Sequence, residues 1–479
     1  PAGSPEALRA AVQNGADAVY LGWGAFNARR GAKNFSDEEF AAALAYCHER
    51  GVRVFLTLNT LVTDRELPQA LETAVQAGRL GVDAVLVQDW GLFGLLRRTL
   101  PDLPLHASTQ MSLFTSGGAR ELAADACERV VIARECSAED TRTICENCPV
   151  EVEVFAHGAL CMCYSGQCFL SSVIGGRSGN RGLCAQPCRL KYGWMDRADS
   201  YPLSLKDLSL AGHLRELRKM GVACVKIEGR MKNPDYVFNV VRVWRRALDM
   251  LRDDAWDPGA VEELERELGR SFNRGFTDAY LRGRSGAELM SFERAINQGV
   301  RVGRLVAVGH EEVTVEFDAA VAAGDTLEIR FYPGVDARPD VPKRWPQVPC
   351  PVDAAAGERV VVHCKRKVGT GCEVYLIRSA GVLDQTAAVL ERMRAEADAI
   401  APVARAVEVL PFEGVAVDGG ASTELVECAV PTRMVFAWQL MDADPRGELD
   451  LSDAVVVLDE VCRTGDAGRT RSLMQRAGR

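Results

Sequence analysis

The chain has 479 residues, a formal net charge of −9, 47% hydrophobic and 26% charged residues, which is the composition of a globular protein with two or three domains. It has no run of about 18 apolar residues, so no membrane-spanning helix is expected, and it shows no signal-peptide pattern. Its acidity excludes a global field that attracts nucleic acid, so any RNA contact needs a local basic patch. The 16 cysteines do not form the framework of a small secreted protein, and we expect a cytoplasmic location.

The first 250 residues alternate between short apolar strands and amphipathic helices. Strands are expected at 17–22, 52–59, 82–89, 103–109, 128–134, 150–158, 201–207 and 222–229. Helices are expected at 4–14, 36–50, 67–79, 116–124, 137–146, 209–220 and 233–252, with Ser36 and Ser137 as N-caps. Strands rich in Val, Ile and Leu are typical of a parallel sheet covered on both faces. Eight such strands, with a further one expected to be cut off before the opening "PAGSPEALRAA", favour an α/β fold of the TIM-like (β/α)8 barrel type over residues 1–255.

The pattern changes after residue 255. Residues 256–296 are expected to form a linker and capping loop, in which the polar, glycine-rich stretch 269–283 is laid over a site. Residues 297–380 contain short alternating strands separated by glycine and proline, which predicts a small all-β domain, a barrel or alternatively a sandwich. Residues 381–479 are expected to hold a helix at 384–400 and a partial α+β region with a strand at 453–460.

Five cysteines fall within the 28 positions from Cys161 to Cys188, in a segment (157–192) inserted after a predicted barrel strand. Cys161, Cys168, Cys184 and Cys188 have the spacing C-x6-C-x15-C-x3-C. Four convergent thiolates can bind zinc or an iron–sulfur cluster. Zinc sites usually use two tight C-x2-C pairs, so this looser spacing favours a cubane cluster.

Other interpretations of the cysteines remain open. The five could be buried free thiols or disulfides, although their polar loop composition favours ligands. Cys163 and Cys224 are alternative ligands. Cys145 and Cys148 form a "CENC" pair that lies outside the motif and has the wrong context for a thioredoxin-type redox site.

Polar residues recur where the predicted strands end, which is the end that carries the active site of a (β/α)8 barrel. The expected catalytic residues are Glu228, Arg230, His157, Arg134 and Asp207. The expected substrate-binding residues are Arg29, Asn34, Asn59, Gln88, Gln110, Arg177, Asn180, Arg181 and Lys206. The arginines among them can clamp carboxylates or phosphates through paired hydrogen bonds. Any single one of these residues could instead serve in a structural ion pair.

The stretch "EVFAHGALCMCYSGQCFLS" fits the signature E-x-F-x-x-G-[SA]-[LIVM]-C-x4-G-x-C-x-[LIVM]-S from Glu153 to Ser171. With "RSGNRGLCAQPCR", "VKIEGRMKNPDYV" and the opening 22 residues, residues 1 to about 290 resemble the collagenase-like peptidases of family U32. The β-domain and tail resemble the subgroup that includes a hydroxylase of ribosomal RNA cytidine. The resemblance implies a 4Fe–4S cluster on the cysteines, RNA as partner, ribosomal rather than transfer RNA, and prephenate as a small carboxylate co-substrate.

The expected function is therefore an iron–sulfur enzyme that hydroxylates a pyrimidine at ring carbon 5 in RNA. A peptidase is the alternative, but the chain has no H-E-x-x-H and no G-x-S-x-G motif. His157 and Cys161 are the one pair in the signature that could serve a cysteine protease. A non-catalytic cluster-binding assembly factor is a third interpretation, which the polar strand ends disfavour.

Overall fold

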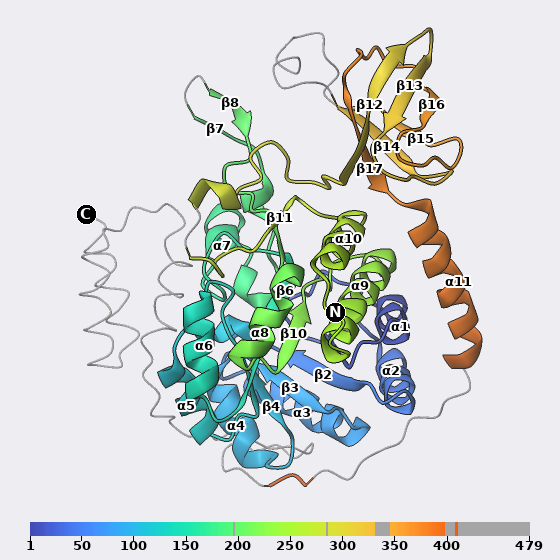
Figure 1. Ribbon diagram of the computed structural model, residues 1–479. Coiled ribbons are helices and arrows are strands. Elements are labelled where there is room, and N and C mark those ends of the chain that lie inside the picture. The colour runs from blue at the N-terminus through green and yellow to red at the C-terminus, as the bar shows by residue number, and fades with distance from the viewer. Residues whose placement is uncertain (195–196, 284–285, 331–344, 398–407, 411–479) are drawn as a thin grey trace. The chain divides into compact units, whose positions relative to one another are not determined.

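The computed structural model describes residues 1–194, 197–283, 286–330, 345–397 and 408–410 (Figure 1). Within these residues the main sheet has nine strands. Adjacent strands pair in parallel in the order β1(Ala18–Leu21), β2(Arg53–Leu58), β3(Ala84–Val87), β4(Leu105–Ala107), β5(Arg129–Val131), β6(Glu151–Ala159) and β10(Cys224–Ile227). The α/β class predicted from the alternating pattern is confirmed.

The start of the chain lies beside both ends of this series. Ala2 forms a parallel bridge with Leu21 of β1, and the Tyr20 hydroxyl donates a 2.8 Å hydrogen bond to the Ile227 carbonyl of β10. A Cβ on Gly3 would lie 1.8 Å from the Arg230 carbonyl oxygen, so only glycine permits this approach. Residues 1–3 thus occupy the place of the expected cut-off strand. In the described ranges no hydrogen-bonded ladder joins them to β10, and the closed (β/α)8 barrel stays a prediction.

Helices surround the parallel strands (Figure 1). Those predicted from the sequence are α1(Pro5–Gln13), α2(Asp37–Glu49), α3(Leu67–Leu80), α5(Ser116–Ala124), α6(Ala138–Asn147), α8(Leu214–Met220) and α9(Pro234–Arg252). Ser36 and Ser137 both form the predicted N-caps, each in a capping box. Helix α4(Trp90–Thr99) was not predicted, because Gly91 and Gly94 weaken its helix propensity; burial of Leu92, Phe93 and Leu96 overrides that weakness.

The strand expected at 201–207 is wrong. The structure has only β9(Asp207–Ser209) there, and it pairs antiparallel with the end of β6 and parallel with β11(Phe276–Thr277). Strand β6 has nine residues and extends beyond its neighbours, so β9 pairs with that extension instead of entering the parallel series. Between β6 and β9 lie α7(Leu170–Gly175) and the hairpin of β7(Tyr192–Trp194) and β8(Arg197–Ser200).

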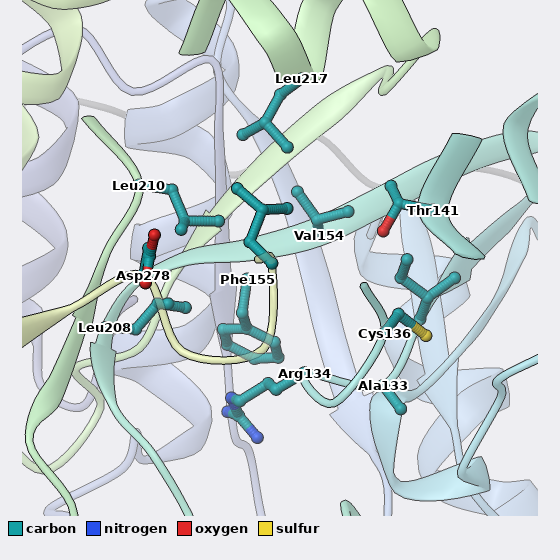
Figure 2. A pocket seen from close by; sticks show the side chains of 12 residues that line it. Ala133, Arg134, Cys136, Thr141, Val154, Phe155, Leu208, Leu210, Leu217 and Asp278 are labelled. Carbon is teal, nitrogen blue, oxygen red and sulfur yellow. The ribbon is translucent and has the colours of Figure 1, made fainter. Parts of the chain in front are cut away.

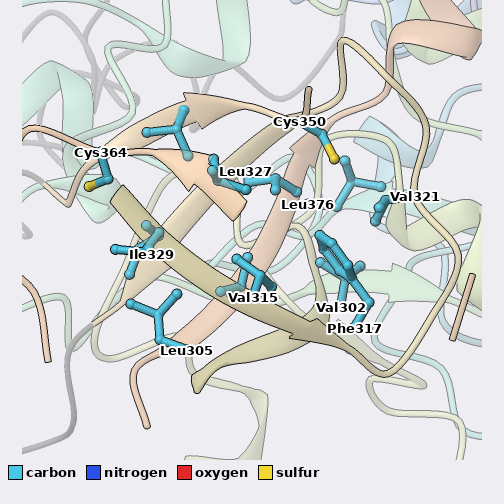
Figure 3. Packing of buried hydrophobic residues seen from close by; sticks show 14 of the residues in the cluster. Val302, Leu305, Val315, Phe317, Val321, Leu327, Ile329, Cys350, Cys364 and Leu376 are labelled. Atoms are coloured by element: carbon cyan, nitrogen blue, oxygen red, sulfur yellow. The ribbon is translucent and has the colours of Figure 1, made fainter. Parts of the chain in front are cut away.

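The range 256–296 contains α10(Pro258–Gly269) and β11, so it is more structured than the predicted linker. A separate antiparallel sheet follows, made of β12(Val300–Val308), β13(Glu312–Phe317), β14(Thr326–Arg330), β15(Gln347–Pro349), β16(Arg359–His363) and β17(Glu373–Arg378). Figure 3 shows the inward-facing apolar side chains of these strands packed together, among them Val315, Phe317 and Leu376. Helix α11(Ala380–Ala397) starts four residues before the predicted position, and the strand expected at 453–460 lies outside the described residues.

Candidate active site

A cavity of about 710 Å³ opens where the parallel strands end. Successive strands and the loops after them supply its floor, through residues such as Tyr20, Thr57, Arg134, Phe155 and Lys226. Its wall is the cysteine-rich segment that follows β6. Since the carboxyl ends of parallel strands carry substrate sites in α/β folds, this cavity is the candidate active site.

The predicted residues that line this cavity come from both the strand ends and the inserted segment. They are Arg29, Asn59, Gln110, Arg134, Arg177, Asn180, Glu228 and Arg230, together with Cys161, Cys168, Cys184 and Cys188. The lining also includes residues that were not predicted from the sequence, among them Tyr20, Thr57 and Phe155. Their signal was the period-two alternation of the strands, which places them on the same face as the polar residues.

Glu228 is the centre of the charged groups on the floor. Its Oε2 accepts hydrogen bonds of 3.0 Å from Arg29 and 3.0 Å from Arg134. Burial alone would raise the pKa of this carboxyl, but the neighbouring guanidiniums outweigh it and lower the pKa to about 2. Glu228 is therefore ionised at neutral pH and acts as an acceptor that orients two arginines.

Arg134 is held on a second side by an aromatic ring. Its guanidinium carbon lies 3.7 Å from the centroid of the Phe155 ring, and Figure 2 shows the two side chains together. This cation–π contact fixes the guanidinium plane without using its remaining N–H donors. Figure 2 also shows a separate cavity of about 30 Å³, lined by apolar residues such as Val154, Leu210 and Leu217. That space suits about one water molecule and is no substrate site.

Arg230 is buried beside this pair. Its Nη1 donates hydrogen bonds to Thr57 Oγ1 at 2.9 Å and to Asn27 Oδ1 at 3.5 Å, while its buried Nε has no partner among the described groups. Burial and the charge of Arg29 lower its pKa to about 10, so it remains charged at neutral pH. A buried cation with an unsatisfied donor is suited to receive an anionic ligand.

The lining as a whole is strongly basic. Lys226 is balanced by Glu153 at 2.6 Å, and Glu153 in turn accepts from Arg129 at 3.0 Å. Of the lining residues that the structure describes, nine are basic and Glu228 alone is acidic; the basic ones are Arg29, Arg30, Arg134, Arg177, Arg189, Lys226, Arg230, Lys232 and Arg274. A site of this composition attracts carboxylates and phosphates.

Lys232 differs from the other cations. Its Nζ lies 3.1 Å from the centroid of the Phe272 ring. Burial, with the charges of Arg274 and Arg189, lowers its pKa to about 7. It can therefore change protonation state near neutral pH.

The cysteine-rich segment is anchored to the body by polar contacts. Ser165 donates from its backbone N to Glu135 at 3.1 Å, and Arg189 donates to the Leu160 carbonyl at 2.8 Å and to Ser204 Oγ at 2.9 Å. Gly166 has φ +77°, and a Cβ there would lie 2.1 Å from the Gln110 carbonyl oxygen. These contacts hold the segment over the strand ends.

Five free thiols of this segment face the cavity, those of Cys161, Cys163, Cys168, Cys184 and Cys188. Within the described ranges, no group of three or more His, Cys, Asp or Glu side chains converges on a point that could hold a metal ion. The backbone N of Gln186 donates to Cys184 Sγ at 3.3 Å, which is the kind of hydrogen bond that supports a thiolate ligand. Cys224 lies in β10 next to Glu153 and is not part of the cavity lining.

The catalytic role expected for His157 does not agree with its position. Lys226 pairs with Phe155 and Ile227 with His157, so β6 has one extra residue at Ala156. This bulge turns His157 to the other face of the sheet, where it packs against Tyr236, Trp244 and Phe276. Burial lowers its pKa to about 3 and keeps it neutral.

Several further expected residues support the cavity from outside. Asp207 is buried and accepts from Arg274 Nη1 at 2.9 Å, so it positions a cation that lines the cavity. Arg181 forms an ion pair with Glu66, and Gln88 Nε2 donates to the Gln110 carbonyl at 3.4 Å. The remaining two, Asn34 and Lys206, are outside the lining; Asn34 donates to backbone carbonyls of its own loop.

A model of peptidase family U32 matches residues 3–291. The chain belongs to this family. It is 36% identical over 341 residues to the 23S rRNA 5-hydroxycytidine C2501 synthase of Escherichia coli, covering 69% of this chain and 52% of that enzyme. This U32 chain thus spans about half the length of that relative.

Two shorter relatives carry other names. Over 303 residues the chain is 34% identical to a collagenase of Porphyromonas gingivalis, covering 59% of the chain and 72% of the relative. Over 305 residues it is 34% identical to the tRNA hydroxylation protein P1 of Bacillus subtilis, covering 61% and 72%. In the described part of this U32 protein, no helix combines the length and the apolar character needed to cross a bilayer.

Proposed function

We propose that this U32 protein hydroxylates a pyrimidine at ring carbon 5 in RNA, with ribosomal RNA as the substrate, a 4Fe–4S cluster as cofactor and prephenate as co-substrate. The observation that carries the proposal is a single cavity lined by five free thiols and by nine basic residues against one acid. Two of the named relatives modify RNA by hydroxylation.

Cys161, Cys168, Cys184 and Cys188 would hold the cluster. The thiols are free and line one cavity. Their C-x6-C-x15-C-x3-C spacing suits a cubane of four irons better than a zinc ion, which usually takes two tight C-x2-C pairs. When bound, such a cluster supplies electron transfer. Cys163 is the fifth thiol of the lining, and we propose it as the dispensable one because it lies outside the C-x6-C-x15-C-x3-C spacing of the other four.

The chain's own residues bind and orient the substrates. Arg29, Arg134 and Arg230 present guanidiniums to the floor of the cavity, where the carboxylates of prephenate would bind. Glu228 holds two of them in place through its ionised carboxylate. Lys232 can take up or release a proton near neutral pH. The target base must leave its stack to enter the cavity.

Peptidase activity is the second candidate, because one relative is named a collagenase. A cysteine protease needs a histidine within hydrogen-bond reach of its thiol. No histidine is among the described residues that line this cavity, and His157 packs on the opposite face of β6. The geometry therefore favours hydroxylation over a thiol-dependent cleavage, and the polar lining favours catalysis over a role as an assembly factor.

Nucleoside analysis of RNA tests the proposal. A strain that lacks the gene should lose one hydroxylated pyrimidine, and the wild-type gene should restore it. Arg230→Ala should fail to restore it while the protein stays folded and keeps its iron content. Unchanged nucleosides in the deletion strain, with gelatin cleavage by the purified protein that is lost in Cys161→Ser, would establish the peptidase instead.

A further inference from the structure

Large apolar side chains are exposed along the cysteine-rich segment. Tyr164 is 55% exposed, Val173 74% and Ile174 60%. Phe169 is also exposed, one position before α7, which carries Val173 and Ile174. Single exposed apolar side chains are common on protein surfaces and need no explanation. Several of them in one short segment indicate a binding surface.

The same segment is locally basic. Residues 154–195 contain no Asp or Glu and four basic residues, in a chain whose net charge is −9. Two of the four, Arg181 and Arg189, are already engaged with Glu66 and with backbone carbonyls. Arg177 donates only its Nε to the Leu183 carbonyl, so its Nη groups have no partner among the described residues.

Arg30 adds a second unengaged cation on the facing loop. It is exposed and lines the cavity, and its guanidinium has no hydrogen bond or ion pair to the residues that the structure describes. Gly182 approaches its loop closely, since a Cβ there would lie 2.3 Å from the Asn27 carbonyl oxygen and 2.9 Å from the Arg30 side chain. Arg30 and the segment therefore share one rim of the cavity.

We propose that the rim binds a single-stranded RNA segment that flanks the target base. We define the rim as the cavity-lining residues Arg30, Tyr164 and Arg177 with the exposed Phe169, Val173 and Ile174 of the same segment. Bases stack on the rings of Tyr164 and Phe169, and phosphates pair with Arg177 and Arg30. The inference rests on the proposed function and adds to it the form of the substrate, an unpaired stretch of RNA.

Three observations favour RNA over a protein partner. Tyr164 and Arg177 belong both to the rim and to the cavity lining, so a strand bound there leads directly to the site. Tyr164 contacts Phe114 edge-on, with ring planes at 82°, which holds its ring while leaving it half exposed. The segment 154–195 combines the exposed rings of Tyr164 and Phe169 with arginines and contains no Asp or Glu, which is a composition typical of single-strand RNA sites.

The test is fluorescence anisotropy of a labelled single-stranded oligoribonucleotide with the purified cluster-containing protein. Tyr164→Ala and Phe169→Ala should each weaken binding about tenfold, whereas Tyr164→Phe should retain it, because stacking uses the ring and not the hydroxyl. Arg177→Gln should lower the slope of log affinity against log salt by about one. Val361→Ala, an exposed apolar residue of β16, and Arg120→Gln on α5 should leave binding unchanged.

The outcomes separate this inference from the proposed function. Normal RNA binding by both ring variants, with visible absorbance of the cluster retained, would overturn the rim. If the ring variants bind RNA normally but no longer bind an acidic electron-transfer protein, the RNA assignment of the rim is wrong and the rim is a protein-binding surface. If the deletion strain keeps all its modified nucleosides but oligoribonucleotide binding depends on Tyr164, the rim stands and the hydroxylase fails.

Discussion

Arg134 and Glu228 are 94 positions apart in the sequence and 3.0 Å apart in the structure, joined across the strand ends by Arg134 Nη2 and Glu228 Oε2. The same oxygen accepts from Arg29 at 3.0 Å, so one carboxylate organises two guanidiniums on the cavity floor. Because the carboxylate and the Arg134 guanidinium are both buried, removing the carboxylate leaves two guanidiniums on the floor without their shared anion.

Glu228→Gln should therefore lower the free energy of unfolding by about 3–5 kcal/mol. Urea denaturation followed by tryptophan fluorescence measures it. The matched control is Glu151→Gln, which breaks the ion pair of Arg129 with a half-exposed carboxylate and should cost no more than about 1 kcal/mol. Equal effects of the two substitutions would show that the cavity floor is hydrated and that the pair is not buried in solution.

Acid should weaken the fold through the buried carboxylates. Lys226 and Arg129 overcome the effect of burial and lower the pKa of Glu153 to about 2, from an ordinary 4.5. Its contribution to stability is thus complete above pH 4.5 and is lost as the pH falls toward 2. Glu153→Gln should make the decline of stability between these values shallower, in urea midpoints measured at successive pH. Glu121→Gln, an exposed acid on α5, should reproduce the wild-type slope.

Much of the parallel sheet could be predicted because its strands are continuously apolar and its helices carry local caps, as at Ser36 and Ser137. The position of β9 could not be predicted, because a short apolar stretch does not indicate which strand it will pair with. It pairs with β6 only because β6 is long. Antiparallel pairing of that kind is decided by tertiary contacts and not by periodicity.

The candidate site, like the fold, could be predicted from the sequence only in part. Glu228, Arg230 and Arg134 could be placed in the cavity because each follows a strand whose end is visible in the sequence. His157 could not be excluded, since alternation puts it on the face of Phe155, and only the bulge at Ala156 reverses it. The basic lining contributed by Arg274 also required the structure, although the stretch 269–283 was expected to cover a site.

Lys232 should react as a neutral amine. Burial lowers its pKa to about 7 from an ordinary 10.5, so at pH 8 the neutral form should exceed the charged form about tenfold. Between pH 7 and 10.5 the unfolded chain binds a proton at Lys232 that the folded protein does not bind. The free energy of unfolding should therefore increase as the pH rises through this range. Brief labelling with acetic anhydride at pH 8, read by mass spectrometry, should modify Lys232 ahead of the exposed Lys33. Slower labelling of Lys232 than of Lys33 would contradict the lowered pKa.

Removal of single thiols should separate ligands from bystanders. Anaerobically purified protein should carry about four irons per chain. Cys184→Ser should lose them, because Cys184 lines the cavity with three other ligands and accepts the Gln186 N–H at 3.3 Å. Cys163→Ser should keep them, because Cys163 lies outside the spacing of the four proposed ligands. Cys145→Ser is the control, since Cys145 packs next to Gly221, away from the cavity lining.

Iron and acid-labile sulfide analysis of these variants decides the ligand set. Cys145 belongs to α6 and does not line the cavity. Removing its thiol should therefore change neither the cavity nor the cysteine-rich segment. Equal iron loss in Cys184→Ser and Cys145→Ser would therefore mean that both had unfolded, which their melting temperatures would reveal, or that the ligands are misplaced. Stoichiometric zinc with no iron after anaerobic reconstitution would refute the cluster itself. A zinc site would need at least three of these thiols to converge on one ion, and within the described ranges no such group is present.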